Sequence, residues 1–128
     1  MKRILIAEDE PFVVRVLKLK LENAGYQVQA EPNGEAALAR LRESPPDVLI
    51  TDIQMPRMTG RELCEHIQAE MPDRRFLIFI LTSRTEVEHR EWSSHIDNVM
   101  FMEKPVSMKD LLARLEQYFA AAPAAVET

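Results

Sequence analysis

Four short, almost wholly apolar runs constrain the fold of this chain more than any other feature. They occupy residues 4–7, 48–51, 76–81 and 99–102. Continuous apolar runs of this length are typical of strands in a parallel sheet that is buried on both faces. A fifth run over 27–31 alternates weakly between polar and apolar residues, which favours a strand nearer the edge. The expected strands are therefore 4–7, 27–31, 47–51, 76–81 and 98–102.

Helical patterns separate the runs. Apolar residues recur at helical spacing between the strands, and residues that start or stop helices bound them: Gly25 as a stop, and Thr59 with Glu62 as a capping box. The helices are expected between 12 and Gly25, over 34–43, from Thr59 to about Ala69, over 86–94 and after Ser107. The chain therefore contains five strand–helix units.

Five such units predict an α/β fold of one architecture. Right-handed crossovers between parallel strands give a three-layer sandwich with helices on both faces of the sheet. We expect the flavodoxin-like (βα)5 arrangement with a parallel five-stranded sheet in the order 2-1-3-4-5, which places the first and third strands side by side. The 128 residues suit one domain, expected over 1–121, followed by a flexible tail rich in alanine and proline over 122–128.

Charge and cysteine content exclude several classes of function. The net charge is −5, and no basic run is longer than Arg74-Arg75. Binding of nucleic acid or of a membrane surface needs clustered basic residues, so we expect neither. Cys64 is the single cysteine, which rules out an intrachain disulfide and agrees with a cytoplasmic location. No run approaches the roughly 20 apolar residues of a membrane span.

Polar residues follow the apolar runs closely. Glu8 and Asp9 come after the first strand, Asp52 after the third, Thr82 after the fourth and Lys104 shortly after the fifth. Ligands of open α/β sheets bind at the carboxyl ends of the strands, where these side chains would converge.

Three carboxylates at one place cannot all stay ionised without help. A pair 4 Å apart repels by about 4 kcal/mol at an effective dielectric of about 20, so either a pKa rises or a cation binds. Ligands that are all oxygen favour Mg²⁺, with Mn²⁺ possible, and the lack of His and Cys disfavours Zn²⁺. A carboxylate beside such a cation can attack phosphorus and become an aspartyl phosphate. The Lys104 ammonium could neutralise phosphoryl oxygens, and the Thr82 hydroxyl could donate a hydrogen bond to them.

The same residues identify a family. The chain resembles the receiver domain of two-component response regulators over about residues 2–120. The matching segments are 4–11, 46–56, the nearby Gly60, 81–83 and Lys104-Pro105. Each is weak alone, but their order and spacing together make a specific signal.

The resemblance implies a role for each site residue. Asp52 would be the phosphoacceptor. Asp9 and Glu8 would hold Mg²⁺ with Asp52 and the main-chain carbonyl of Gln54. Thr82 would bond the attached phosphoryl group. Lys104 would pair with that group and precede a cis peptide bond to Pro105.

The resemblance also implies a switch. Thr82 would move toward the phosphoryl group, and Phe101 would turn inward, which would remodel the surface formed by helix 86–94, strand 98–102 and the last helix. The partners would be a sensor histidine kinase or phosphotransfer protein, a downstream protein or output domain, and possibly a second copy. The chain would not be an enzyme beyond its own phosphorylation and dephosphorylation.

Three classes of enzyme with similar folds lack their characteristic motifs in this sequence. A P-loop is absent, Glu8-Asp9-Glu10-Pro11 would repel a dinucleotide pyrophosphate, and Asp52-Ile53-Gln54 lacks the second aspartate of a haloacid-dehalogenase-type phosphatase. A receiver-like interaction module that works without phosphorylation remains the alternative. Thr82 could merely cap the following segment, and Phe101 could be only a core residue.

Overall fold

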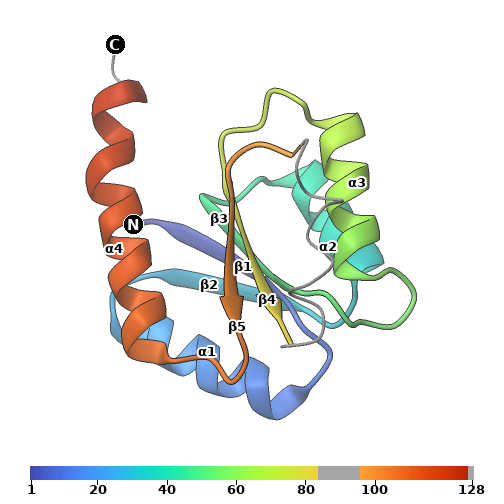
Figure 1. The fold of residues 1–128 in the computed structure, drawn as a ribbon, viewed down its shortest axis with the longest axis horizontal. Coiled ribbons are helices and arrows are strands. Elements are labelled where there is room, and N and C mark those ends of the chain that lie inside the picture. Colours follow the sequence, from blue (N-terminus) through green and yellow to red (C-terminus); the bar gives the residue numbers. More distant parts are fainter. Residues whose placement is uncertain (84–95, 127–128) are drawn as a thin grey trace.

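The computed structural model describes residues 1–83 and 96–126 of the chain, and strands and helices alternate as expected over residues 3–82 (Figure 1). The predicted helix 86–94 lies outside the described residues. In chain order the elements are β1 (Arg3–Ala7), α1 (Pro11–Asn23), β2 (Gln27–Glu31), α2 (Gly34–Glu43), β3 (Val48–Asp52), α3 (Gly60–Glu70), β4 (Leu77–Thr82), β5 (Val99–Glu103) and α4 (Met108–Val126).

The five strands form one parallel sheet in the order β2-β1-β3-β4-β5. Helices α1 and α4 cover one face of this sheet, and α2 and α3 cover the other (Figure 1). Ile6 of β1 pairs with Ala30 of β2 on one side and Ile50 of β3 on the other, so β1 and β3 are neighbours. The predicted fold class and strand order are confirmed.

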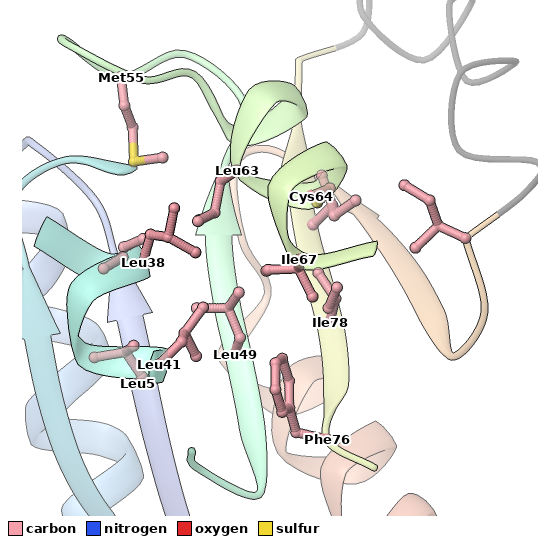
Figure 2. Packing of buried hydrophobic residues seen from close by; sticks show 14 of the residues in the cluster. Leu5, Leu38, Leu41, Leu49, Met55, Leu63, Cys64, Ile67, Phe76 and Ile78 are labelled. Atoms are coloured by element: carbon pink, nitrogen blue, oxygen red, sulfur yellow. The ribbon is translucent and has the colours of Figure 1, made fainter. Parts of the chain in front are cut away.

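Each central strand contributes side chains to two hydrophobic cores, one on each face of the sheet, because successive side chains of a strand point to opposite faces. In β4, Leu77, Phe79 and Leu81 join the core under α1 and α4. The alternating Ile78 and Ile80 join the core under α2 and α3. Figure 2 shows the second core, in which Leu38 and Leu41 of α2 and Leu63 and Ile67 of α3 face strand residues such as Leu5, Leu49 and Ile78. Burial on both faces explains why these strands are continuous apolar runs.

Local sequence sets the helix ends. The predicted capping box is present: the Thr59 side chain accepts from the backbone N–H of Glu62, and the Glu62 carboxylate accepts from that of Thr59. Asn33 caps α2 by accepting from Ala36 N at 2.8 Å. Gly25 follows α1 with a φ of +99°, a conformation that favours glycine. Ser107 accepts from Asp110 N at the start of α4, as predicted.

The C-terminal helix extends further than the sequence pattern indicates. Its backbone continues to Val126, past the expected domain boundary at 121. The division into a receiver domain over 1–121 and a tail over 122–128 stays a prediction. Over 1–83 and 96–126, no helix combines the length and apolar character that crossing a bilayer would need.

Candidate functional site

The carboxyl edge of the sheet brings three acidic side chains together. Glu8 and Asp9 directly follow β1, and Asp52 is the last residue of β3, the neighbouring strand. One carboxylate oxygen from each lies within 4.8 Å of the others, the spacing that a shared cation needs. Among the residues that the structure describes, this is the one group of His, Cys, Asp or Glu side chains with such spacing. The convergence predicted from sequence is therefore observed.

Lys104 closes the site from the β5 side. Its Nζ donates to Asp52 Oδ2 at 2.6 Å and lies 3.7 Å from Glu8 Oε1. The backbone N–H of Lys104 donates to the Thr82 carbonyl at 2.7 Å, which anchors the residue to the end of β4, and the Lys104–Pro105 peptide bond is cis, as expected. Burial lowers the pKa of the ammonium, but the hydrogen bond and charge of Asp52, with Glu8, outweigh burial and raise it overall. Lys104 is thus held as a cation.

Glu8 is buried, with 1% of its surface exposed. Its Oε2 accepts from the backbone N–H groups of Asp9 and Glu10 at 3.0 and 3.2 Å. Its Oε1 has no hydrogen-bond partner within the described residues. Burial raises the pKa of Glu8 to about 7, and the Asp52 charge adds to this, while the Glu10 amide and Lys104 oppose it. Without a cation this carboxyl is therefore about half protonated near neutral pH.

Thr82 places a hydroxyl at the end of β4. The residue is fully buried, and its Oγ1 has no hydrogen-bond partner in the described part of the chain. An unpaired buried hydroxyl costs roughly 1–3 kcal/mol, so its presence calls for a ligand or a role. The strand register sets Thr82 one residue beyond Leu81, which pairs with Asp52. A donor without a protein partner is therefore available beside the phosphoacceptor candidate.

The donor set fits a hard divalent cation. Every candidate ligand atom is oxygen. Glu8 Oε1 accepts no hydrogen bond in the described residues, and Asp9 is exposed, so both carboxylates could bind an ion together with water. Gln54 is exposed in the loop after β3, and its N–H lies 3.4 Å from Asp52 Oδ1. That distance is longer than a typical N–H···O hydrogen bond. The role of the Gln54 carbonyl as a ligand stays a prediction.

Phe101 lies in β5 opposite Ile80 and is half-buried. It packs against the core under α2 and α3, whereas Met100 and Met102 belong to the core under α1 and α4. These three side chains therefore alternate between the two faces of the sheet. The switch role of Phe101 stays a prediction.

Two glycines support the site in a way that the sequence reasoning missed. A Cβ on Gly60 would lie 2.1 Å from the Asp52 carbonyl oxygen, and Gly60 N donates to the Ile53 carbonyl at 2.7 Å. A Cβ on Gly34 would lie 2.5 Å from the Met58 carbonyl oxygen. Both glycines begin helices, where glycine is a poor former. A glycine at the first position of a helix was therefore the one sequence signal that another backbone segment packs closely against it.

An apolar hollow of about 500 Å³ adjoins the site between α1 and the β5–α4 connection. Its lining includes the charged Lys104 and Glu10 and the apolar Phe12, Val16 and Val106. Phe12 is 71% exposed, although its spacing within the helix pattern suits a core position. This surface also escaped the sequence reasoning, because exposure depends on how α1 meets the β5–α4 connection.

Comparisons with known proteins agree with this geometry. The family model described as the response regulator receiver domain matches residues 4–116 of this chain. The chain is 38% identical to the response regulator receiver protein CpdR of Brucella abortus over 95% of this chain and all of CpdR. It is 30% identical to PhoP of Bacillus subtilis, an alkaline phosphatase synthesis transcriptional regulatory protein, over 90% of this chain and 47% of PhoP.

Solved structures show the same fold. The chemotaxis protein CheY4 of Vibrio cholerae superposes with a TM-score of 0.82 at 27% identity, covering 91% of this chain and 98% of CheY4. TrrA of Thermotoga maritima, solved in complex with Mg²⁺-BeF, gives 0.79 at 30% identity, with the same two coverages. The chain therefore belongs to the response regulator receiver family.

Proposed function

We propose that Asp52 accepts a phosphoryl group from the phosphohistidine of a sensor histidine kinase or phosphotransfer protein. The observation that carries this proposal is the buried Asp52 carboxylate, held 2.6 Å from Lys104 Nζ and next to Glu8 and Asp9. Receiver domains act in phosphorylation-dependent signalling as a family, and the described site offers the charges that such a reaction needs.

The transfer follows from the arrangement. An Asp52 carboxylate oxygen attacks phosphorus and forms the O–P bond, while the P–N bond of the phosphohistidine breaks and its electron pair stays on the imidazole nitrogen. Lys104 moves from the carboxylate to the phosphoryl oxygens, where its charge offsets theirs. The unpartnered Thr82 hydroxyl donates to the same group. Hydrolysis by water later returns Asp52, so the only reaction that the domain assists is on its own side chain.

Mg²⁺, or Mn²⁺ in its place, would be held by Glu8, Asp9, Asp52 and the main-chain carbonyl of Gln54. When bound, the cation neutralises the carboxylates and the phosphoryl oxygens. The raised pKa of Glu8 supports this assignment, because burial, its largest cause, and the charge of Asp52 both disfavour an ionised carboxylate that a bound cation would stabilise. TrrA, a relative with the same fold, was solved with Mg²⁺-BeF.

The output is a change of surface. Phosphorylation adds about −1.5 to −2 charges at Asp52. Thr82 is drawn to that charge, and Phe101 turns into the space it leaves. This movement alters the face formed by β5 and α4, which a downstream protein, an output domain or a second copy would bind. Phe101 is half-buried against the core under α2 and α3 and lies on the strand that pairs with β4, which carries Thr82.

The phosphodonor protein would meet the apolar hollow beside Lys104. A protein that brings phosphohistidine to Asp52 must cover the adjoining surface, and Phe12 offers exposed apolar area there. The protein can be mixed with a panel of purified, phosphorylated histidine kinases to find the kinase that transfers phosphate to it fastest. We expect Phe12→Ala to slow transfer from that kinase. Labelling of the same variant by acetyl phosphate should be unchanged.

The test of the proposed function is intact-mass measurement after incubation with Mg²⁺ and either acetyl phosphate or phosphoramidate, whose P–N bond resembles that of phosphohistidine. We expect one Mg²⁺-dependent phosphate on the wild type and on Asp73→Asn, an exposed aspartate control, and none on Asp52→Asn. Absence of phosphate from the folded wild type with both donors would instead favour an interaction module that works without phosphorylation.

A further inference from the structure

The start of helix α2 is packed directly against the loop that follows the phosphoacceptor. Gly34 is buried at the first position of α2. A Cβ there would lie 2.5 Å from the carbonyl oxygen of Met58, and 2.9 and 3.0 Å from its Cβ and Cγ. The nearest obstacle is backbone, which cannot rotate aside as a flexible side chain could. Any side chain at position 34 therefore requires the helix or the loop to move.

The loop in contact with Gly34 is the one that carries the site. It connects Asp52 at the end of β3 to Gly60 at the start of α3, and Gln54 lies on it. Two internal hydrogen bonds make it compact: Gly60 N donates to Ile53 O, and Met58 N donates to Pro56 O, both at 2.7 Å. A short loop tied in this way has little slack, so a displacement at Met58 reaches Gln54 and the Asp52 backbone.

Helix α2 is the more rigid of the two partners. Asn33 caps its first turn through Ala36 N, and Ala37, Leu38 and Leu41 are buried in the core below. The loop, by contrast, contains Arg57 in the left-handed region at a φ of +67°. Its exposed ion pair with Glu35 of α2, at 3.7 Å, adds little energy. Under a steric conflict the loop is the part that gives way.

We propose that Gly34 is a positioning residue for the cation site: its missing side chain lets α2 hold the 53–59 loop in the position that presents Gln54 and Asp52 to the ion. This inference rests on the proposed function, in which that loop supplies a main-chain ligand. It predicts a coupling between a residue on the α2 side of the sheet and cation affinity, although Gly34 itself bears no ligand atom.

The experiment compares two glycine variants by titration calorimetry with Mg²⁺. Gly34→Ala should weaken Mg²⁺ binding about tenfold, the usual effect of disturbing a support behind a metal ligand. Gly25→Ala is the matched control, because its φ of +99° makes alanine strained while open space surrounds it, so it lowers stability without touching the loop. Its Mg²⁺ affinity should equal that of the wild type.

A second readout separates positioning from general destabilisation. The Mg²⁺ concentration that half-saturates phosphorylation by acetyl phosphate should rise in Gly34→Ala, with the rate at saturating Mg²⁺ largely retained. A variant that is merely less stable would show a smaller active fraction at an unchanged half-saturation point. Wild-type affinity in folded Gly34→Ala would overturn the inference.

If Gly34→Ala does not fold, Met58→Ala decides, since it removes the Cγ beside Gly34 and so loosens the side-chain part of the same contact without a clash. Weaker Mg²⁺ binding then supports the inference, and wild-type binding overturns it. If the wild type itself binds no Mg²⁺, the proposed function fails and the inference fails with it. Failure of the inference alone leaves wild-type binding and phosphorylation intact.

Discussion

Replacing Glu8 with glutamine should make the metal-free protein more stable at alkaline pH. The pKa of Glu8 is about 7 in the folded protein against an ordinary 4.5, so between these values the folded state keeps a proton that the unfolded chain has released. The unfolding free energy therefore falls as pH rises through this window. Glu8→Gln removes the titration, and its amide oxygen can still accept from the Asp9 and Glu10 N–H groups.

The size of the effect follows from the pKa difference. Each pH unit between 4.5 and about 7 lowers the unfolding free energy by about 1.4 kcal/mol, and the loss levels off at about 3 kcal/mol. Glu8→Gln should thus unfold at a higher urea concentration than the wild type at pH 8. Near pH 5 the two proteins should differ little, because most Glu8 carboxyls are then protonated in the folded state.

Urea unfolding in EDTA at several pH values from 5 to 8 measures this directly. The difference between variant and wild type cancels the titration of other groups. Glu22→Gln, an exposed glutamate at the far end of α1, is the control and should shift stability by less than about 0.5 kcal/mol at every pH. Mg²⁺ at about 1,000 times its dissociation constant should reverse the order at pH 8, because it adds about 4.1 kcal/mol to the wild type, which exceeds the advantage of Glu8→Gln. Parallel pH profiles of wild type and Glu8→Gln would refute the reasoning.

Three further predictions concern the surrounding structure. Lys104→Met leaves the buried Asp52 carboxylate without its partner and should lower the unfolding free energy in EDTA by about 1–3 kcal/mol. Mg²⁺ should restore this stability, and equal urea midpoints for variant and wild type in EDTA would contradict the pairing. Cys64 is buried, and burial raises the pKa of its thiol to about 12. Ellman's reagent at pH 8 should therefore react with it only as fast as the protein unfolds locally around it. Rapid labelling of the native protein would contradict this burial. Thr59→Ala removes the capping box of α3 and should cost about 1 kcal/mol by thermal unfolding, with no loss if the cap is unimportant.

The sequence predicts the fold well because the fold depends on local patterns. Strand 27–31 and helix 34–43 have the predicted ends, and the other described strands differ by about one residue, as assignments commonly do. The double burial of β3 and β4 leaves continuous apolar runs, and parallel pairing then fixes where their ends meet. The convergence of Asp52 with Glu8 and Asp9 follows from that pairing.

Features that depend on how distant loops meet were not predictable. The contact of Gly34 with Met58 joins the start of α2 to the loop between β3 and α3, and neither sequence gives a sign of the other. The sequence Glu8-Asp9-Glu10 looks like a solvated turn, yet Glu8 is buried while Asp9 and Glu10 are exposed. The exposure of Phe12 likewise depends on the path of the chain from β5 to α4. Periodicity along one segment carries no information about these distances.

The most direct test of the central claim locates the phosphoryl group. The protein is incubated with Mg²⁺ and acetyl phosphate, reduced with borohydride, which converts an acyl phosphate to the alcohol, and digested for peptide mass spectrometry. We predict homoserine in place of Asp52 and at no other position, and no conversion when EDTA replaces Mg²⁺. An unmodified Asp52 in protein that has gained phosphate, or no gain of phosphate at all, would contradict the account.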